Sequence, residues 1–282
     1  MGGLESPRLL LQSFENNGSL NKLIGKGLMD HPFAIIGKLS IKKNIIFKQI
    51  GNSNFLSNNS ERIGYRVEKE LRSSGLNHSL FIRPGMTKNI EKLRHNLKLL
   101  LYEKFSLKIF FSIFFNIDAI KLALTLLSEK MGFGYISKNF LVTMQLEQNS
   151  NQTSRVKLSK NYDEYNRRIP EIHEKISEEL IKDIKNIQTH FSKIVINDCK
   201  FEKFNVSKND LIPGAHYSGT CRMGIKKKNS VVDGDLKYHG IKNLYVCDSS
   251  IFPKIGNANL VFTISAFSIR LANYLKKLIK NK

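Results

Sequence analysis

Two short segments in the last quarter of the chain constrain its fold more than any other part of the sequence. The first spans residues 216–224 and reads His-Tyr-Ser-Gly-Thr-Cys-Arg-Met-Gly. The second follows a short apolar run, reads Asp-Ser-Ser at residues 248–250, and continues into Gly-Asn-Ala-Asn at residues 256–259. Glycine and polar side chains at this density are typical of loops that carry function rather than of packed elements. We therefore expect the two segments to meet in space and form one catalytic surface.

Composition sets the size of the core and the class of partner. With 282 residues, 41% of them hydrophobic, the chain can bury one large core or two modest ones. Its net charge of +21 would suit nucleic acid, an anionic membrane surface or an acidic partner. The excess is mostly lysine, spread singly or in pairs between apolar residues, which is more typical of coding bias than of a binding patch. Nucleic acid is therefore not favoured, although a basic binding protein remains an alternative.

Cysteine usage and hydropathy indicate the compartment. The sequence has three cysteines, Cys199, Cys221 and Cys247, and no Cys-x-x-Cys pair. An odd number without such pairs argues against a disulfide framework and against a zinc site. No signal peptide opens the sequence. The most apolar region, residues 97–127, is interrupted by lysines and acidic residues that are costly inside a bilayer. We expect a cytoplasmic protein without a metal site or a transmembrane segment.

Alternating hydrophobicity predicts strands in two parts of the chain. We expect residues 140–148 and 154–159 to pair as a β-hairpin around a polar turn at residues 149–152. Further strands are expected at residues 33–40, 44–48 and, mixed with a helix, within 62–83.

Apolar residues at three- and four-residue steps predict helices over residues 90–131, 172–191 and 261–279. The first of these is expected to pack on the protein's own sheet rather than on a membrane. At the amino end, a tight glycine turn is expected to lead into a helix with Ser6 as its N-cap and Pro7 at its first position. The buried face of the last helix is expected to consist of Ile264, Phe267, Leu271 and Leu275.

Several segments together resemble the glucose-methanol-choline (GMC) family of FAD-dependent oxidoreductases, in order and at similar spacing. The resemblance is weak between residues 51 and 134 and most specific in the carboxy-terminal block. The matching segments are Gly2–Leu10, Gly25–Pro32, Glu147–Leu158, His216–Gly224, Tyr238–Ser250 and Gly256–Thr263.

The resemblance implies an α+β, truncated GMC-like fold, in which an antiparallel substrate lobe with helices joins a remnant of the FAD-binding lobe. Residues 1–32 would be the remnant of the FAD-binding domain. Residues 33–213 would form the substrate-binding domain, and residues 214–282 a catalytic segment that returns to the FAD-binding domain.

One family feature has no counterpart in the sequence. The family opens with a Rossmann Gly-x-Gly-x-x-Gly turn that holds the FAD pyrophosphate at a helix N-terminus, and this sequence contains none. The resemblance begins at Met1, inside the family's second signature. We therefore expect the carboxy-terminal part of a longer enzyme, from a split gene, a truncated reading frame or a degenerate copy. The isolated chain is expected to bind FAD weakly or not at all.

The resemblance also implies the chemistry. The family oxidises the CH–OH group of an alcohol or sugar and transfers hydride to the flavin. His216 matches the family's catalytic histidine, which would accept the hydroxyl proton because imidazole titrates near neutral pH. Asn259 matches the second polar group, which orients the hydroxyl at the start of the last helix, with Asn257 as the fallback.

Cofactor contacts and partners follow from the same resemblance. FAD is the implied cofactor, and its contacts are assigned to Gly3, Asp248, Ser249 and Asn257. The expected partner is a small-molecule alcohol or sugar. A separate FAD-binding chain is one alternative, and an inactive or subunit-dependent fragment is another. His31 is interpreted as a structural loop residue near the flavin domain.

Overall fold

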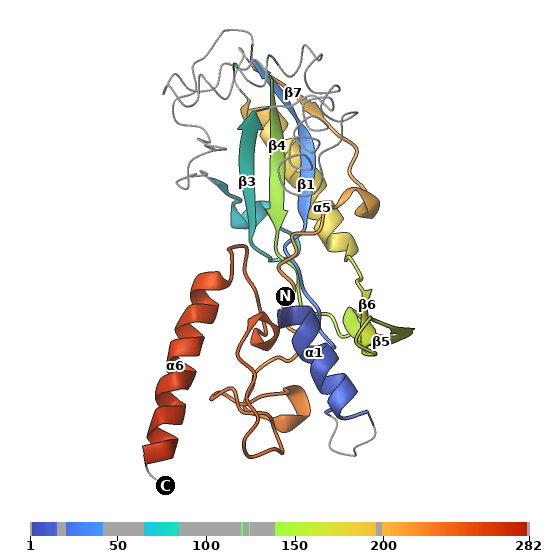
Figure 1. The fold of residues 1–282 in the computed structure, drawn as a ribbon. Coiled ribbons are helices and arrows are strands. Elements are labelled where there is room, and N and C mark those ends of the chain that lie inside the picture. Colours follow the sequence, from blue (N-terminus) through green and yellow to red (C-terminus); the bar gives the residue numbers. More distant parts are fainter. Residues whose placement is uncertain are drawn as a thin grey trace.

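The protein consists of an upper and a lower lobe (Figure 1). Each lobe has its own cluster of buried hydrophobic residues. The upper lobe is an antiparallel sheet with a helix against one face, and the lower lobe holds both the amino-terminal helix and the carboxy-terminal segment. The computed structural model describes residues 2–15, 21–41, 65–84, 120, 124, 139–195 and 199–280.

The upper lobe is built on a five-stranded sheet in the order β2-β3-β4-β1-β7. Every neighbouring pair in this sheet is antiparallel. β4 lies at its centre and is buried along nearly its whole length, as its run of apolar residues requires. The predicted α+β class with an antiparallel sheet is confirmed. The strands are β1 (Phe33–Ile41), β2 (Tyr65–Arg66), β3 (His78–Pro84), β4 (Asn139–Leu146) and β7 (Cys199–Lys203).

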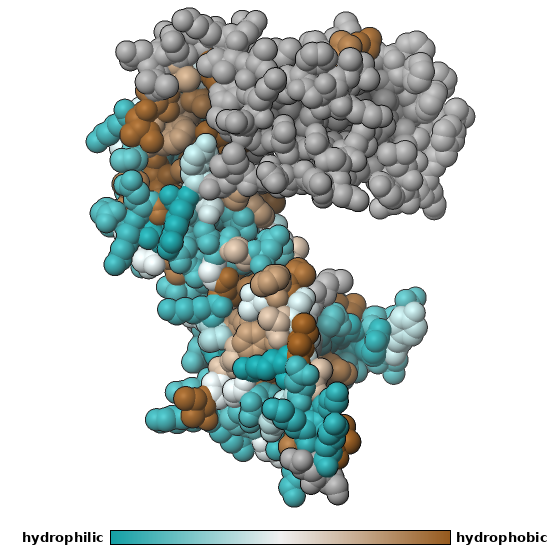
Figure 2. Space-filling model, turned by 90° about the vertical axis from the view of Figure 1, so that its left-hand side faces the viewer, coloured by the Kyte–Doolittle hydropathy of each residue, from teal (hydrophilic) through white to brown (hydrophobic). Residues whose placement is uncertain are grey.

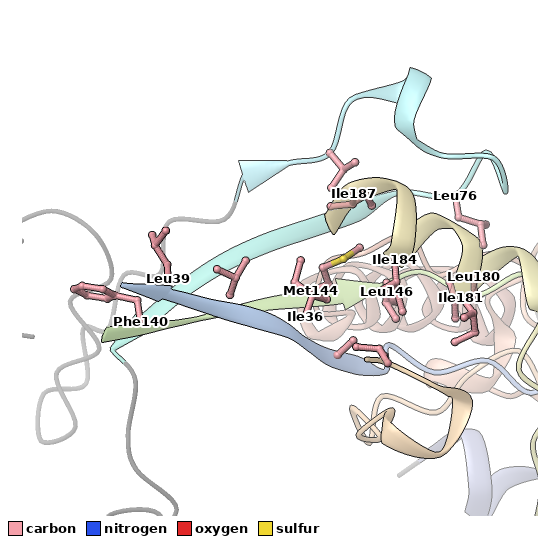
Figure 3. Packing of buried hydrophobic residues seen from close by; sticks show 14 of the residues in the cluster. Ile36, Leu39, Leu76, Phe140, Met144, Leu146, Leu180, Ile181, Ile184 and Ile187 are labelled. Atoms are coloured by element: carbon pink, nitrogen blue, oxygen red, sulfur yellow. The ribbon is translucent and has the colours of Figure 1, made fainter. Parts of the chain in front are cut away.

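Helix α5 (Glu178–Ile194) covers one face of this sheet. Its first turn is capped by Ser177, whose side chain accepts a hydrogen bond from the backbone N–H of Leu180. Apolar residues at helical spacing turn toward the sheet and pack against β1 and β4 (Figure 3). The buried hydrophobic residues of α5 are Leu180, Ile181, Ile184 and Ile187.

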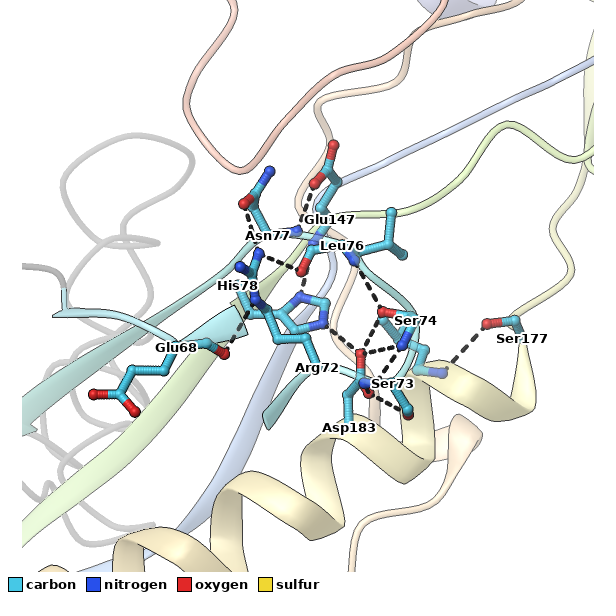
Figure 4. Close-up of polar contacts among 11 residues, drawn as sticks. Glu68, Arg72, Ser73, Ser74, Leu76, Asn77, His78, Glu147, Ser177 and Asp183 are labelled. Carbon is cyan, nitrogen blue, oxygen red and sulfur yellow. Dashed lines mark hydrogen bonds and ion pairs between the residues drawn. The ribbon is translucent and has the colours of Figure 1, made fainter. Parts of the chain in front are cut away.

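A buried polar network ties α5 to β3 and to the loop before it (Figure 4). Asp183 on α5 accepts hydrogen bonds from the backbone and hydroxyl groups of Ser73 and Ser74. Its carboxylate also contacts Nε2 of His78 at 3.0 Å, and Nδ1 of that ring accepts the backbone N–H of Glu147. Because Nδ1 is an acceptor, the proton of a neutral His78 is on Nε2 and donates to Asp183.

The lower lobe combines both ends of the chain. α1 packs against a separate two-stranded sheet and against the turn at Ser249–Ile251. α6 stands at the edge of this lobe (Figure 1). The regular elements are α1 (Gly2–Ser13), β5 (Arg155–Tyr162), β6 (Arg168–His173) and α6 (Val261–Lys280), with 3₁₀ turns at Lys69–Leu71 in the upper lobe and at Lys208–Asp210, Lys227–Asn229 and Ser249–Ile251.

The predicted start of α1 was wrong. The helix begins at Gly2 rather than after Ser6, and Pro7 lies inside it. A proline has no N–H to give to the carbonyl four residues earlier, here that of Gly3. That carbonyl instead accepts the hydroxyl of Thr220 at 2.8 Å. A tertiary hydrogen bond therefore replaces the helical one that Pro7 cannot make.

The predicted β-hairpin was also wrong, although both of its strands exist. β4 pairs with β1 and β3, whereas β5 pairs with β6 in the other sheet. The residues between β4 and β5 cross from one lobe to the other. There the carbonyl of Ser154 accepts the N–H groups of Gly27 and Leu28. The pairing depends on these distant loops, so alternation within the two strands does not reveal it.

The predicted helix over residues 172–191 starts later, because β6 occupies residues up to His173 and Ser177 caps α5. The final helix was placed correctly, but no residue of α6 is fully buried. Ile264, Phe267 and Leu271 are only partly buried against the lower core. The strand expected at residues 44–48 and nearly all of the helices expected over 90–131 fall outside the described residues. The proposed domain boundaries remain predictions.

Candidate active site

The two polar segments of the carboxy-terminal region meet in the lower lobe. The N–H of Cys221 donates to the carbonyl of Ser250 at 2.8 Å, and the N–H of Met223 donates to that of Ile251 at 2.7 Å. The first segment also pairs with the loop at residues 25–32, because Met29 and Ser218 exchange two backbone hydrogen bonds of 3.0 Å. Three loops that are far apart in the sequence therefore form one surface at the junction of the lobes.

Asp30 fixes the backbone immediately before His216. Its carboxylate accepts the N–H of Gly214 at 2.8 Å, of Ala215 at 3.2 Å and of His216 at 2.7 Å. The Asp30 side chain is only 1% exposed. Three successive N–H groups that converge on one anion form the concave arrangement known as a nest. Ala215 lies in the left-handed region at φ 58°, which turns the chain just before His216.

His31 lies directly beside His216. The two ring centroids are 5.5 Å apart, with the ring planes at 74°. His31 is fully buried, and neither of its ring nitrogens has a hydrogen-bond partner in the part of the chain that the structure describes. Nδ1 of His216 is also buried without a partner there. Unpaired buried nitrogens are rare and call for an explanation, such as a catalytic role or a bound water or ion.

Electrostatics keep the His31 ring neutral. Burial lowers the pKa of His31 to about 4, and His216 lowers it further as a like charge, whereas Asp30 and Glu147 oppose this shift. The backbone of Leu146 also opposes it. Close by, burial raises the pKa of the Tyr217 hydroxyl, and the charges of Asp30 and Glu174 raise it further. A second cation next to His216 is therefore disfavoured at neutral pH.

Gly3, Asp248 and Ser249 come together at the N-terminus of α1. The Ser249 hydroxyl accepts the N–H of Gly3 at 3.0 Å and donates to the carbonyl of Tyr217 at 2.7 Å. The Asp248 carboxylate accepts the hydroxyl of Ser6 and caps the turn that follows it. A Cβ atom on Gly3 would lie 2.1 Å from the Tyr217 carbonyl oxygen, so only glycine fits there. These side chains bind the protein itself, and their contacts with a cofactor remain predictions.

Asn257 and Asn259 differ in their surroundings. The side-chain amide of Asn257 donates to the hydroxyl of Ser79 in the upper lobe at 2.6 Å. Asn259 is exposed directly before α6, and its side chain makes no hydrogen bond with the residues that the structure describes. Within the described part of the chain, neither side chain hydrogen-bonds to His216. The structure therefore assembles His216 with Asp30 and His31, while the catalytic assignment of Asn259 remains a prediction.

Asp30 and His31 lie in the candidate site beside His216, a placement that the sequence interpretation missed. Residues 29–32 read Met-Asp-His-Pro and were taken as part of a structural loop. Adjacent acidic and imidazole side chains before a strand were a signal, but only the fold shows that both are buried beside His216. Within the described ranges, no group of three potential metal ligands occurs and no helix is long and apolar enough to span a bilayer.

A family model described as GMC oxidoreductase matches residues 150–268. Three curated relatives align over short stretches. A pyridoxine 4-oxidase of Microbacterium luteolum is 58% identical over 40 residues, which are 14% of this chain and 8% of the relative. An oxygen-dependent choline dehydrogenase of Citrobacter koseri is 39% identical over 61 residues, which are 22% of this chain and 11% of the relative. A long-chain-alcohol oxidase of Arabidopsis thaliana is 32% identical over 68 residues, which are 24% of this chain and 9% of the relative.

Two solved structures share the fold. The pyridoxine 4-oxidase of Mesorbium loti superposes with a TM-score of 0.51 at 14% identity, over 96% of this chain and 49% of that one. A formate oxidase of Aspergillus oryzae superposes with a TM-score of 0.52 at 16% identity, over 99% of this chain and 53% of that one. The chain therefore spans about half the length of these structures. The resemblance seen in the sequence is confirmed: residues 150–268 match the carboxy-terminal family model described as GMC oxidoreductase, and the solved structures of this fold are matched over about half their length.

Proposed function

We propose that the chain supplies the catalytic and substrate-binding part of an FAD-dependent oxidoreductase that acts on the CH–OH group of an alcohol or sugar. The observation that carries this proposal is the arrangement around His216. Its backbone is fixed by a buried carboxylate, and its Nδ1 has no partner among the described residues. His216 lies in the segment that the family model matches, residues 150–268, whereas Asp30 lies outside it.

In this proposal, His216 accepts the proton of the substrate hydroxyl. A histidine is suited to this role because imidazole can take up and release a proton near neutral pH. The neighbouring His31 stays neutral and does not compete for the proton. Asn259, exposed before the first turn of α6, would orient the hydroxyl from the other side. The helix N-terminus behind it favours negative charge on the oxygen.

The described residues fit only one end of FAD. The unpaired Nδ1 of His216 and the exposed Asn259 suit a substrate and the reacting ring of a flavin. The N-terminus of α1, in contrast, is closed by Asp248 and Ser249 and offers no free site for the pyrophosphate. When bound, FAD would supply the acceptor for the hydride that leaves the alcohol carbon.

Replacement of the proposed base tests this function. His216→Gln is expected to lower kcat for alcohol oxidation by about 100-fold or more, the usual contribution of general acid–base catalysis. The measurement is dye-coupled oxidation of an alcohol and sugar panel, with FAD supplied and the FAD-binding polypeptide co-expressed. His239→Gln, a histidine hydrogen-bonded to Ser230 away from the site, is the matched control. Equal rates for the two variants would remove His216 from the reaction.

The exposed face of α6 supports a second part of the proposal, a separate FAD-binding chain as partner. Figure 2 looks onto this side of the molecule and shows hydrophobic residues on the surface of the lower lobe. Phe262 is 86% exposed, and Val261 and Ile269 are 71% and 64% exposed. A helix with apolar residues on both faces is normally covered on both. The solved structures of this fold, about twice as long, contain further polypeptide that would supply such a cover.

Co-purification from the native host tests this partner. We expect the tagged chain to capture a polypeptide that contains Gly-x-Gly-x-x-Gly and carries FAD, and Phe262→Glu to abolish the capture. Lys228→Glu, on an exposed turn of the same lobe, should leave it intact. The chain purified alone is expected to be colourless. Two results would contradict the proposal of a partner chain: a yellow flavoprotein purified from the single chain, or undiminished capture of the FAD-binding polypeptide by the Phe262→Glu variant.

A further inference from the structure

We propose that Asp30 and His31 are positioning residues for His216, Asp30 through the backbone that carries the ring and His31 through the ring itself. The proposal rests on the proposed role of His216 as the base. It assigns a task to two adjacent buried residues, neither of which the sequence resemblance placed in the reaction.

The first step is the backbone turn before His216. Ala215 has a side chain and yet adopts φ 58°, a left-handed conformation that is strained for a non-glycine residue. All three N–H groups of residues 214–216 donate to the Asp30 carboxylate. Hydrogen bonds to a buried charge are strong enough to hold this conformation. Without the carboxylate, the turn would have no compensation for its strain.

The second step is the close contact between the loops that carry the two histidines. A Cβ atom on Gly214 would lie 2.2 Å from the carbonyl oxygen of His31, so the loops approach more closely than any side chain there would allow. This approach brings the His31 ring against the His216 ring in an edge-to-face arrangement. The ring of His216 is therefore limited on one side by a buried neighbour.

The third step concerns charge. The titratable groups that face His31 are His216, Asp30 and Glu147. When His216 takes the hydroxyl proton, the new positive charge forms beside a neutral ring. A second positive charge beside it would be unfavourable. The proton remains on His216, and His31 keeps its charge state throughout.

The test uses the isolated, isotope-labelled chain and NMR, so it needs no flavin and no substrate. Asp30→Asn is expected to reduce the hydrogen-exchange protection of the amides of residues 214–216 by about 10-fold or more. It should also weaken the nuclear Overhauser effect between the rings of His31 and His216. Unchanged protection together with an unchanged ring contact would overturn the proposal.

Two further variants make the result specific. Asp233→Asn removes a carboxylate that likewise accepts two backbone N–H groups, from Asp235 and Lys237, but lies in another turn. It should leave the amides of residues 214–216 unchanged. Ala215→Gly, added to Asp30→Asn, should restore part of the ring contact, because glycine adopts the left-handed turn without a clamp. Absence of this rescue would count against positioning through the backbone.

His31→Ala provides a second route if Asp30→Asn does not fold. It should leave the three amides protected, since Asp30 remains, but make the His216 ring mobile and narrow its signals. A His216 ring that stays as ordered as in the wild type would overturn the role of His31. In the assembled enzyme, Asp30→Asn should lower kcat more than it raises KM. If the wild-type assembly oxidises no alcohol, the proposed function fails, while the NMR result still decides the positioning.

Discussion

The two lobes treat their buried histidines differently. In the upper lobe, His78 is fully buried and both ring nitrogens are hydrogen-bonded, to Asp183 and to the backbone of Glu147. At the junction with the lower lobe, His31 is equally buried, and neither ring nitrogen is bonded to a described residue. Burial lowers the pKa of both imidazoles, and at His78 the side-chain hydrogen bond with Asp183 opposes this shift.

The helices show the same contrast. α5 buries one face completely, whereas α6 has no fully buried residue. Among the residues that the structure describes, every unpaired buried side-chain nitrogen or oxygen lies outside the sheet and helix of the upper lobe. The buried polar side chains of the described part of the upper lobe thus have partners within the protein. The lower lobe, in contrast, has buried polar atoms around His216 without a partner among the described residues, and exposed apolar side chains on α6. Both features are expected of a surface that binds substrate, cofactor and partner.

The largest effect is expected from breaking the satisfied network of the upper lobe. Asp183→Ala should lower the free energy of unfolding by about 3–5 kcal/mol, because it leaves His78, Ser73 and Ser74 without their buried partner. Urea denaturation measures the change. Asp210→Ala, which removes an exposed carboxylate that bonds Ser207, should cost about 1 kcal/mol. Similar losses for the two variants would contradict the comparison.

The buried His31 predicts that the stability of the protein depends on pH. The folded pKa of His31, about 4, lies below the unfolded value of 6.5. Between these values the unfolded chain binds a proton that the folded chain does not, so stability falls by about 3 kcal/mol as the pH drops through this window. His31→Phe should remove this part of the loss. Both proteins retain His78, whose pKa is also lowered, so the difference between them isolates His31. Denaturation at pH 7 and pH 4.5 measures it, and equal losses would refute the assignment.

Within the lower lobe, satisfied and open hydroxyls should also differ. Thr220→Val deprives the Gly3 carbonyl of its donor and should cost about 1–3 kcal/mol. Ser218→Ala removes a buried hydroxyl that has no partner among the described residues and should be neutral or slightly stabilising. Thermal unfolding of both variants tests this difference. A larger loss of stability for Ser218→Ala than for Thr220→Val would show that the Ser218 hydroxyl has a stabilising partner.

The smallest effect is expected on the outer face of α6. Phe262→Ala should change the free energy of unfolding of the isolated chain by less than about 0.5 kcal/mol, because this side chain is 86% exposed. Phe267, on the inner face, packs edge-to-face on Phe252 at 5.6 Å, and its replacement by alanine should cost roughly 2 kcal/mol. Equal costs would mean that the outer face is already covered.

Sequence reasoning located most of the described strands and α6, because their hydrophobic periods are local properties. It misassigned the partner of the strand at residues 154–159. β5 pairs with β6, the next strand along the chain, and its Val156 N–H donates to the carbonyl of Gly25, which is distant in the sequence. It placed Pro7 at a helix start, because the compensating Thr220 hydroxyl lies more than two hundred residues away.

For the site, the family motif led to His216, but Asp30 and His31 were read as loop residues. Their significance lies in burial and in a backbone turn at Ala215, and neither is encoded in a local pattern. The structure assembled these three residues, whereas the sequence identified the one that matches a known motif.

The most direct test of the proposed function is anaerobic reduction of the flavin in the assembled enzyme. Alcohol should bleach the flavin absorbance when the chain is wild type, and His216→Gln should slow the bleaching by about 100-fold or more. Bleaching at the wild-type rate by His216→Gln, or no bleaching by any alcohol or sugar of the panel, would contradict the assignment of this chain as the catalytic part of the oxidoreductase.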